Sequence, residues 1–313
     1  MKLKLLCSIL SATLGTGSMA AVILLPPGPL YFQFTNLEQT ALGVNSVGVP
    51  LNNTNTYTGC SGAPEGNWGV AQVSVIRAGS VNPTGAITGM VGNDINSLGS
   101  APFFSDQVFP VIGGQVTAMF YGTVTTSISK NGTVNSLQST GGFIDLFWDD
   151  PTLSNTIVNI STLTPGMRTG DASFAGVTDG MLLGRLSFAS GINPSNPTTD
   201  IQGTVDTALA NNSGSADSYA NVVDVNGDGV INALDGLWAR QLNSDWFGTV
   251  FGPRDIRFSN KIDNNPNWDG QAGVTGQTSN DPGRAFVVPE PNSLTLISLG
   301  LLALGTIGRK RNT

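Results

Sequence analysis

The 313-residue sequence contains no histidine, and this absence excludes several classes of chemistry. Without an imidazole there is no His-based catalytic triad, no histidine general base and none of the common zinc or iron sites that use histidine ligands. Most familiar hydrolase mechanisms are therefore excluded. Hydrolysis by a pair of carboxylates, as in glycosidases, remains open.

Cysteine is almost as scarce, since Cys7 and Cys60 are the only two. Cys7 lies inside the N-terminal segment that we interpret below as a cleaved signal, which leaves Cys60 alone in the mature chain. A single cysteine cannot form an internal disulfide, so the fold must be stabilised by packing or by a bound metal. We interpret Cys60 as a buried thiol rather than a reactive one.

The first twenty residues have the order of a secretory signal. Lys2 and Lys4 give a positive start, an apolar middle follows, and a small-x-small cleavage site ends at Ala20, before Ala21. The pattern predicts a signal peptide over residues 1–20 and export of the rest of the chain. The alternative interpretation is an amphipathic first strand or helix.

The last 26 residues place a Pro-Glu-Pro motif, an apolar run and a basic cluster in that order. The two prolines keep the motif extended and accessible to an enzyme, because proline fixes φ and lacks an amide donor. The run from Leu294 to Ile307 would reach roughly 21 Å as a helix, short of the roughly 30 Å of a bilayer core, which predicts a weak anchor. The basic cluster should stay on the cytoplasmic side and leave the preceding chain outside. The residues of this sorting segment are Val288, Pro289, Glu290 and Pro291, followed by Arg309, Lys310 and Arg311.

This order of motif, hydrophobic segment and basic tail resembles the PEP-CTERM sorting signal of Gram-negative bacteria that make extracellular polysaccharide. The resemblance covers about 26 of the 313 residues, so it bears on delivery and not on activity. It implies recognition by an exosortase-type membrane protease, transient anchoring in the inner membrane, and final placement on the cell surface or in the extracellular matrix. The alternative for the same residues is a buried core helix behind a Pro-rich loop.

Removing both signals makes the chain strongly acidic. Five of the 14 basic residues lie in the signals, which leaves nine against all 21 acidic residues and a mature net charge near −12. Such a chain should bind neither nucleic acid nor an anionic membrane. Its charged partners should be cations, with Ca²⁺ the first candidate.

The body of the chain has the pattern of a β protein. Charged residues make up only 11% of the sequence, glycine is frequent, and apolar residues alternate with polar ones from Tyr31 to about Gly203. We therefore predict a mainly β fold, an antiparallel β-sandwich of the jelly-roll type. Its body spans residues 21–210, followed by a calcium loop and helix region over residues 211–280 and by a linker with the sorting signal over residues 281–313.

Two strands can be placed from their apolar pattern. Ala71, Val73 and Val75 alternate with polar residues, as in a strand with one buried face. The run from Phe143 to Trp148 is apolar on both faces, with Ile144, Leu146 and Trp148 sharing one of them, so we place it centrally. Three segments also resemble the body of PEP-CTERM exoproteins associated with flocculation: residues 66–70, 120–122 and 142–145.

A hairpin is predicted where Asn131-Gly132 separates two β-rich runs. This dipeptide is typical of a type I′ turn, in which both central residues take positive φ. The partner strand should then begin near Val134.

Asp145, Asp149 and Asp150 cluster around the end of the dense strand and invite a catalytic or metal-binding interpretation. We interpret Asp145 instead as pointing outward, and Asp149-Asp150-Pro151 as a turn, where aspartate before proline is common. No other residue of the body marks a partner carboxylate. We therefore assign no catalytic residues and expect the protein not to be an enzyme.

One stretch carries a clear chemical motif, the twelve residues from Asp224 to Asp235. Calcium takes about six to eight oxygen ligands, and a loop with side-chain oxygens at alternate positions can surround it if a glycine, here Gly229, permits the sharp turn. Ile231 should point inward as a hydrophobic plug. The predicted ligands are Asp224, Asn226, Asp228, the Val230 carbonyl, Asn232 directly or through water, and Asp235.

A single helix should leave this loop, because apolar residues recur after it at helical spacing. No entering helix precedes the loop. One loop with only its exiting helix resembles half of a type I dockerin, which pairs two such segments to bind cohesin. The second candidate, Asn265 to Gly270, lacks a carboxylate at its twelfth position, Gly276, so we do not expect cohesin binding. The residues of the predicted helical stripe are Leu234, Leu237, Trp238, Gln241 and Leu242.

These features predict an exported, acidic, calcium-stabilised protein with a structural or adhesive role and no catalysis. The association with exopolysaccharide, in biofilm or floc, is what the sorting-signal resemblance implies. The alternative is a carbohydrate-binding module or a carbohydrate-active hydrolase with structural calcium. Exposed aromatic residues such as Trp68, Trp148 or Tyr121 would favour glycan binding, and two carboxylates about 5–10 Å apart in a groove would favour hydrolysis.

Overall fold

The structure is a computed structural model, and it describes residues 24–52, 59–82, 94–97, 103–105, 114–150, 157–206 and 213–289. The predicted signal peptide, with its cleavage site, and the sorting segment from Glu290 to the C-terminus lie outside the described residues. Within the part of the chain that is described, no helix is both long and apolar enough to cross a membrane.

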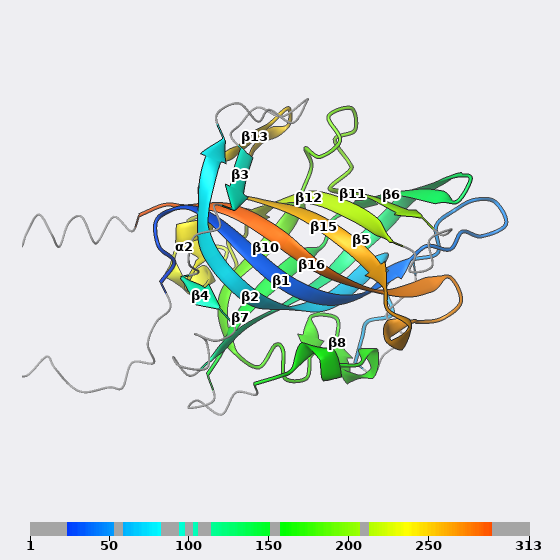
Figure 1. Ribbon diagram of the computed structural model, residues 1–313, viewed down its shortest axis with the longest axis horizontal. Helices are drawn as coiled ribbons and strands as arrows, with labels where there is room; N and C mark the ends of the chain where they lie inside the picture. Colours follow the sequence, from blue (N-terminus) through cyan, green and yellow to red (C-terminus); the bar gives the residue numbers. More distant parts are fainter. Residues whose placement is uncertain are drawn as a thin grey trace, which may run out of the picture.

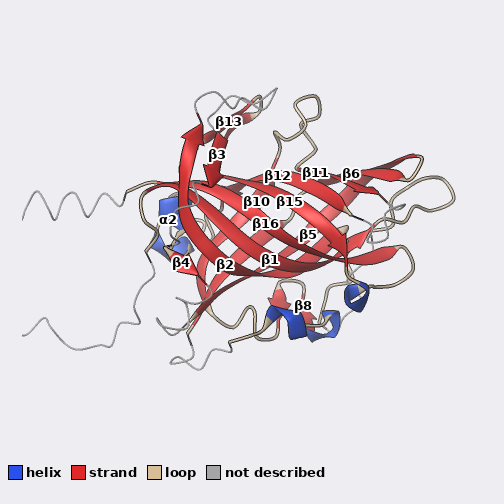
Figure 2. Cartoon of the chain, in the orientation of Figure 1, coloured by secondary structure: helices blue, strands red, loops and turns tan. Residues whose placement is uncertain are grey.

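Antiparallel strands dominate the described chain, and its helices are single short turns (Figure 2). Twelve strands form one sheet in the order β10-β7-β5-β6-β11-β12-β15-β16-β1-β2-β3, with β4 beside β2. This confirms the predicted mainly β, antiparallel fold. The strands of the sheet are β1 (Gly28–Ala41), β2 (Asn67–Asn82), β3 (Asp94–Ser97), β4 (Phe104–Ser105), β5 (Gln115–Asn131), β6 (Val134–Thr140), β7 (Phe143–Asp149), β10 (Met181–Ala189), β11 (Ile201–Asp206), β12 (Gly214–Val222), β15 (Ile256–Asn264) and β16 (Val274–Val287). Two small hairpins join β8 (Arg168–Gly170) to β9 (Ser173–Phe174) and β13 (Phe247–Thr249) to β14 (Gly252–Arg254).

The sheet curves back on itself, so its strands surround a common core (Figure 1). Two further pairings close the curved sheet, because the first half of β5 pairs with β2 and the end of β12 pairs with β10. On its other side β5 pairs with β7 as far as Tyr121 and with β6 from Val124 onward. Strands on opposite sides of the core therefore face one another, as in the two packed layers of the predicted sandwich.

The sheet crosses the predicted boundary at residue 210. β12, β15 and β16 all follow that boundary, yet they pair within the same sheet as β1. β16 pairs with β1 from Gly28↔Val287 to Ala41↔Val274, so the predicted linker from residue 281 is also strand up to Val287. The sequence pattern did not predict β16 as a strand, because buried residues of β16 such as Gln277 and Ser279 are polar rather than apolar. The predicted calcium loop thus lies between β12 and β15, two strands of this same sheet.

Apolar clusters lie on both faces of the sheet. The first fills the interior and includes Trp148, Leu183 and Trp238. The second covers the outer face of β1, β2 and β5, where the rings of Trp68 and Trp268 lie 5.7 Å apart between centroids. The covering residues come from residues 157–180, which contain the turns η2 (Ile160–Thr162) and η3 (Pro165–Met167). Burial on both faces explains the two-sided apolar pattern of these strands.

The predicted faces of the dense strand, now β7, are confirmed. Ile144, Leu146 and Trp148 all contribute to the interior cluster. On the opposite face Phe147 is buried, whereas Phe143 keeps 37% of its surface exposed.

The predicted alternation of β2 is wrong at Val75. The β1–β2 register shifts between Gln33 and Phe34, which face Val75 and Val73, so Ser74 is an extra residue on β2. Beyond this bulge Ile76 is fully buried in the interior cluster and Val75 is only half-buried. A β-bulge moves the following side chains to the opposite face, and nothing in this stretch of sequence announces it.

The predicted hairpin forms between β5 and β6, and β6 begins at Val134 as expected. Its turn type differs from the prediction. Asn131 pairs with Val134, so the two loop residues are Gly132 and Thr133, and only Gly132 has a positive φ, of 63°. A positive φ at the first central residue alone corresponds to a type II′ turn, which needs glycine there because a Cβ disfavours that conformation.

Candidate functional site

The predicted calcium loop leads from β12 to the short helix α2 (Ala239–Leu242) and is anchored on β10. The Leu237 amide donates to the Leu182 carbonyl at 3.3 Å, and the Trp238 amide donates to the Leu183 carbonyl at 2.6 Å. Trp238 is fully buried in the interior cluster. α2 therefore lies at one end of the curved sheet (Figure 1) and closes that end of the core.

Side chains of the loop hold its backbone in a tight curl. Asp224 accepts hydrogen bonds from the amides of Gly227 at 2.7 Å and Gly229 at 2.6 Å, and Asp228 accepts one from Val230 at 2.9 Å. Gly227 and Gly229 have φ of 74° and 85°, a region that residues with a Cβ rarely adopt. Ile231 packs against the interior cluster, as the plug prediction requires.

Asp235, the last residue of the loop, joins its two ends. The side chain is fully buried, with Oδ1 accepting from the amides of Val225 at 2.8 Å and Asn226 at 3.0 Å and Oδ2 from Asn232 at 2.8 Å. Burial acts to raise the pKa of this carboxyl, but the amide hydrogen bonds outweigh it and hold the pKa below its usual value. Asp235 therefore remains ionised inside the protein.

The predicted exiting helix is broken in two. A 3₁₀ turn, η4 (Ala233–Asp235), is separated from α2 by residues 236–238, which begin with Gly236 at a φ of 129°. Leu234 is 76% exposed and so does not belong to the buried stripe, whereas Trp238 and Leu242 are buried. The helix is interrupted because the amides of Leu237 and Trp238 donate to carbonyls of β10 instead of to carbonyls of a helix. Gly236 lies so close to β10 that a Cβ on it would be 2.6 Å from the Leu183 carbonyl.

The donor types in the loop are those that calcium takes, since they are carboxylate, amide and backbone oxygens. The side-chain amides of Asn226 and Asn232 donate to Asp228 Oδ2 at 3.2 and 3.1 Å, so their partially positive N–H groups occupy the side of this carboxylate oxygen that a cation would approach. Presenting oxygens to an ion requires both amides to turn over. Among the described residues, no three acidic or cysteine side chains gather closely enough to hold a metal by themselves.

The second candidate loop has a structural role. Its residues form the turn η5 (Pro266–Trp268), which buries Trp268 in the outer cluster. The indole Nε1 donates to the Leu163 carbonyl at 3.0 Å, and Asp269 accepts from the Gly276 amide at 2.9 Å. This segment therefore holds Trp268 in the outer cluster.

The three acidic residues in and just after β7 do not converge on one site. Asp145 lies on the outer face as predicted, but it is buried there, with Oδ1 and Oδ2 each 2.7 Å from the guanidinium of Arg185, which lies opposite on β10. Asp149 is fully buried beside Thr117, and Asp150 is also buried. Pro151, of the predicted turn, lies outside the described residues. Asp145 and Asp149 therefore serve separate contacts.

Two of the three aromatic residues considered for glycan binding are unavailable to a ligand. Trp68 is fully buried in the outer cluster and Trp148, at 3% exposure, in the interior. Tyr121 is half-buried on the outer face beside Phe143. Cys60, which we predicted to be buried, is half-buried and forms no disulfide within the described chain.

A buried ion pair that the sequence did not indicate joins the outer cluster to the sheet. Arg168 Nη1 lies 2.7 Å from Glu65 Oε2, and both side chains are almost fully buried. The guanidinium also lies 4.4 Å above the Trp68 ring. Burial raises the pKa of Glu65 despite this partner. Because the two residues are more than a hundred positions apart, only the fold brings them together.

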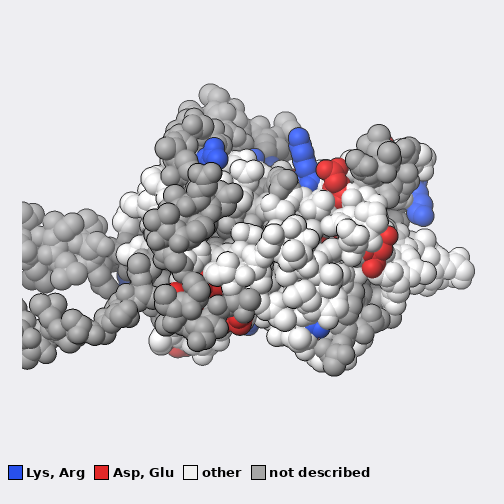
Figure 3. Space-filling model, turned by 60° about the horizontal axis from the view of Figure 1, so that its bottom comes forward, with Lys and Arg blue, Asp and Glu red and all other residues white. Residues whose placement is uncertain are grey.

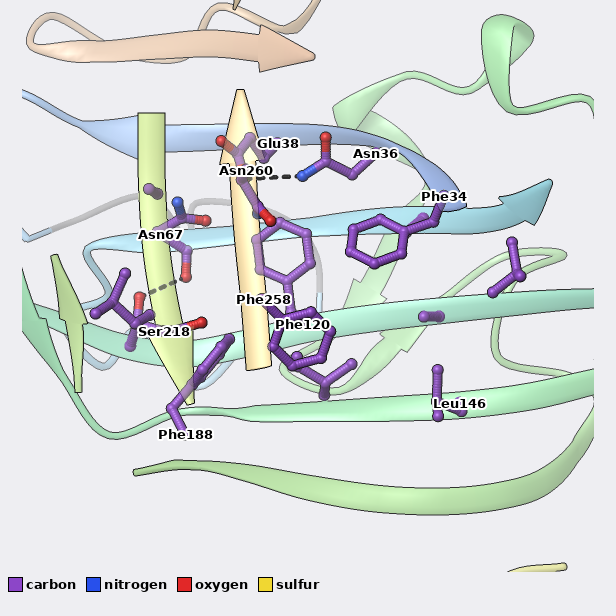
Figure 4. A pocket seen from close by; sticks show the side chains of 17 residues that line it. Phe34, Asn36, Glu38, Asn67, Phe120, Leu146, Phe188, Ser218, Phe258 and Asn260 are labelled. Carbon is purple, nitrogen blue, oxygen red and sulfur yellow. Dashed lines mark hydrogen bonds between the residues drawn. The ribbon is translucent and has the colours of Figure 1, made fainter. Parts of the chain in front are cut away.

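The interior contains a cavity of about 80 Å³ where the apolar half of the core meets a polar half. Figure 4 shows phenylalanine rings on one side of it and amide, hydroxyl and carboxylate groups on the other. The Asn36 amide donates to Glu38 at 3.3 Å within this polar half. The labelled residues that line the cavity are Phe34, Asn36, Glu38, Asn67, Phe120, Leu146, Phe188, Ser218, Phe258 and Asn260.

A second cavity of about 20 Å³ adjoins the first and shares Asn67 with it. Four buried polar atoms around the two cavities have no hydrogen-bond partner among the described residues: Asn67 Oδ1, Asn260 Oδ1, Ser139 Oγ and Gln277 Nε2. A buried polar atom is costly unless it is paired, and a polar cavity of this size has room for water. This polar interior could not be predicted from the sequence, because its residues come from many separate strands.

The chain matches no protein-family model, no curated protein and no solved structure. The sites described above therefore rest on the chain's own residues.

Proposed function

We propose that this chain is an exported, calcium-stabilised β protein of the cell surface or extracellular matrix of a Gram-negative bacterium, with a structural or adhesive role in association with exopolysaccharide. The observation that carries the proposal is the order of segments in the sequence. A secretory signal precedes the β body, and a PEP-CTERM-like motif, a short apolar run and a basic tail follow it. The expected processing partner is an exosortase-type protease, with the apolar run held transiently in the inner membrane.

Calcium is assigned to the loop from Asp224 to Asp235, with the side chains of Asp224, Asn226, Asp228, Asn232 and Asp235 and the Val230 carbonyl as ligands. The oxygen-rich donor set and the two glycines with positive φ support this assignment. A bound ion would supply positive charge that fixes the curl of the loop. Because the loop leads directly to the buried Trp238, its stiffness bears on the end of the core. Extracellular calcium is abundant relative to weak extracellular sites, so the ion would stabilise the fold rather than act as a switch.

The proposal includes no catalytic step. Asp145 is held by Arg185 and Tyr121, and Asp149 is buried beside Thr117. Glu65 is paired with Arg168. These acidic side chains thus have structural contacts, which supports a non-enzymatic role. A carbohydrate-active hydrolase is the weaker alternative, because it needs two carboxylates facing one groove.

A carbohydrate-binding module is the stronger alternative. Phe143 is partly exposed beside Tyr121, and aromatic side chains of this kind provide apolar contact area at recognition surfaces. A carbohydrate-binding module would bring a partner protein to the polysaccharide. An adhesin would instead attach the polysaccharide to the matrix. A dockerin-type scaffold component would need a second ion loop, and the segment around Trp268 has a structural role instead.

The test incubates the purified protein with the producer's exopolysaccharide, with calcium or with a chelator. Co-sedimentation and newly released reducing ends are measured in the same tubes. Binding without new reducing ends supports the adhesive role. Loss of binding in chelator would mean that binding depends on the proposed calcium loop. New reducing ends, or no association with the polymer under either condition, would overturn the proposal.

A further inference from the structure

Three planar side chains stand side by side on the outer face of neighbouring strands. Tyr121 on β5 lies directly opposite Phe143 on β7, and Arg185 on β10 lies opposite Asp145, two residues further along β7. The Tyr121 and Phe143 ring centroids are 5.9 Å apart, and the guanidinium carbon of Arg185 is 5.8 Å from the Phe143 centroid. We name Tyr121, Phe143 and Arg185 the outer row.

Asp145 fixes the geometry of the outer row from below. It binds Arg185 through two hydrogen bonds of 2.7 Å, and it accepts a third from the Tyr121 hydroxyl at 3.1 Å. Bidentate pairing of this kind orients a guanidinium group as well as binding it. The outer row is therefore ordered before any ligand arrives, which reduces the entropy lost on binding.

The outer row also has unused binding capacity. Phe143 is 37% exposed, and the Arg185 side chain is 32% exposed. An arginine has five N–H donors, and Asp145 takes one on Nε and one on Nη2. The remaining N–H groups, on Nη1 and Nη2, have no acceptor within the described chain.

Two of the three glycines near the rings leave free space, whereas Gly142 is crowded by Thr123. Gly122 follows Tyr121 and Gly141 precedes Phe143 by two residues, and both have positive φ, of 75° and 68°. A Cβ on either would meet a single atom within 4 Å, at 3.8 Å, so neither position is crowded by the protein. An extended ligand that crosses the rings would meet backbone rather than side chains there.

The charge of this surface favours a neutral ligand. Asp145 cancels the charge of Arg185, and the mature chain carries a net charge near −12, which repels polyanions. Among the described residues on the face of the molecule drawn in Figure 3, charged side chains are a minority. A neutral sugar ring matches the outer row, since its C–H face packs on aromatic rings and its hydroxyls accept from guanidinium N–H groups.

The geometry points to the outer row of Tyr121, Phe143 and Arg185 as a contact site for neutral polysaccharide. This inference rests on the proposed association with exopolysaccharide and adds the residues and the class of sugar. Phe143 supplies most of the apolar contact. Arg185 supplies directional hydrogen bonds to hydroxyl groups.

The experiment compares the full-length protein with three variants: Phe143→Ala, Arg185→Lys and, as a matched control, Met181→Ala, which removes another exposed apolar side chain from β10 (40% exposed). Arg185→Lys retains the charge beside Asp145 but loses the planar fork. Affinities are measured by co-sedimentation with the producer's exopolysaccharide and by calorimetry with cellohexaose, mannohexaose and, as the acidic probe, hexagalacturonate. Thermal unfolding of each variant establishes that it is folded.

We expect Phe143→Ala to weaken binding to the polymer and to a neutral hexasaccharide by roughly threefold to tenfold, with a similar loss for Arg185→Lys and none for Met181→Ala. If the wild-type protein binds the polymer and all variants bind equally well, the outer row is not the contact site although the proposed function stands. Binding of hexagalacturonate alone among the oligosaccharides would overturn the neutral-sugar assignment. A wild-type protein that binds no probe and no polymer would overturn the proposed function itself.

Discussion

The Thr117 hydroxyl lies 2.9 Å from Asp149 Oδ2 and 2.6 Å from the Val177 carbonyl. A hydroxyl has one proton to donate, and a backbone carbonyl can only accept. One proton cannot serve both acceptors at once, so the Thr117 hydroxyl donates either to Asp149 or to the Val177 carbonyl. Burial, opposed by the Thr117 hydrogen bond and assisted by the charge of Asp179, raises the pKa of Asp149 to about 7.

The first prediction concerns pH. Unfolded Asp149 has a pKa near 3.8, so between about pH 3.8 and 7 the folded state holds a proton that the unfolded state has lost. The free energy of unfolding should therefore fall as pH rises through this window, by roughly 4 kcal/mol at most, with the full loss present above pH 7. Asp149→Asn keeps the shape of the side chain and an oxygen acceptor for the Thr117 hydroxyl, and it cannot titrate.

Denaturant unfolding between pH 4 and 8 measures this effect. The difference in stability between Asp149→Asn and wild type should grow as pH rises, whereas the exposed control Asp263→Asn should run parallel to wild type. Equal pH slopes for Asp149→Asn and wild type would show that Asp149 is ionised throughout.

The second prediction concerns the proposed calcium loop. Asp228→Ala removes a predicted ligand, so it should lower the melting temperature in calcium and abolish the difference between calcium and chelator. Asp263→Ala removes an acidic side chain outside the loop and should leave that difference intact. A chelator effect of the same size in Asp228→Ala would dispose of the loop as the ion site.

The third prediction concerns the approach of Gly236 to β10. Gly236→Ala places a Cβ 2.6 Å from the Leu183 carbonyl, whereas Gly28→Ala, at a similar φ of 106°, meets nothing within 4 Å. Both variants strain the backbone, but only the first displaces β10. Gly236→Ala should lose about 1–3 kcal/mol more stability than Gly28→Ala in urea unfolding. Equal losses would mean that the loop is not held against β10.

The fourth prediction concerns the buried pair of Glu65 and Arg168. Arg168→Met leaves Glu65 without its cationic partner and should cost about 3–5 kcal/mol, while the double variant with Glu65→Gln should recover much of that loss. Lys130→Met, at an exposed position, controls for removing a positive charge. If the double variant is no more stable than Arg168→Met alone, Arg168 acts through packing on Trp68 rather than through the charge pair.

The β architecture could be predicted because side-chain alternation and turn residues are local properties of the sequence. The faces of β7 and the hairpin at Gly132 followed from such patterns. The bulge at Ser74 and the strand identity of β16 did not follow, since both depend on which strand lies alongside. The break at Gly236 had the same origin, because β10 claims amides that a helix would otherwise use.

By itself the sequence determined the chemistry that is excluded by the absence of histidine, the acidic balance of the chain, the position of the oxygen-rich loop and the alternation that makes strands. Only the tertiary structure decided which side chains meet. It buried Trp68 and Trp148, placed Asp145 under Arg185, and joined Glu65 to Arg168. The physical reason is that burial and ion pairing depend on contacts between strands distant in sequence, which spacing along one chain does not encode.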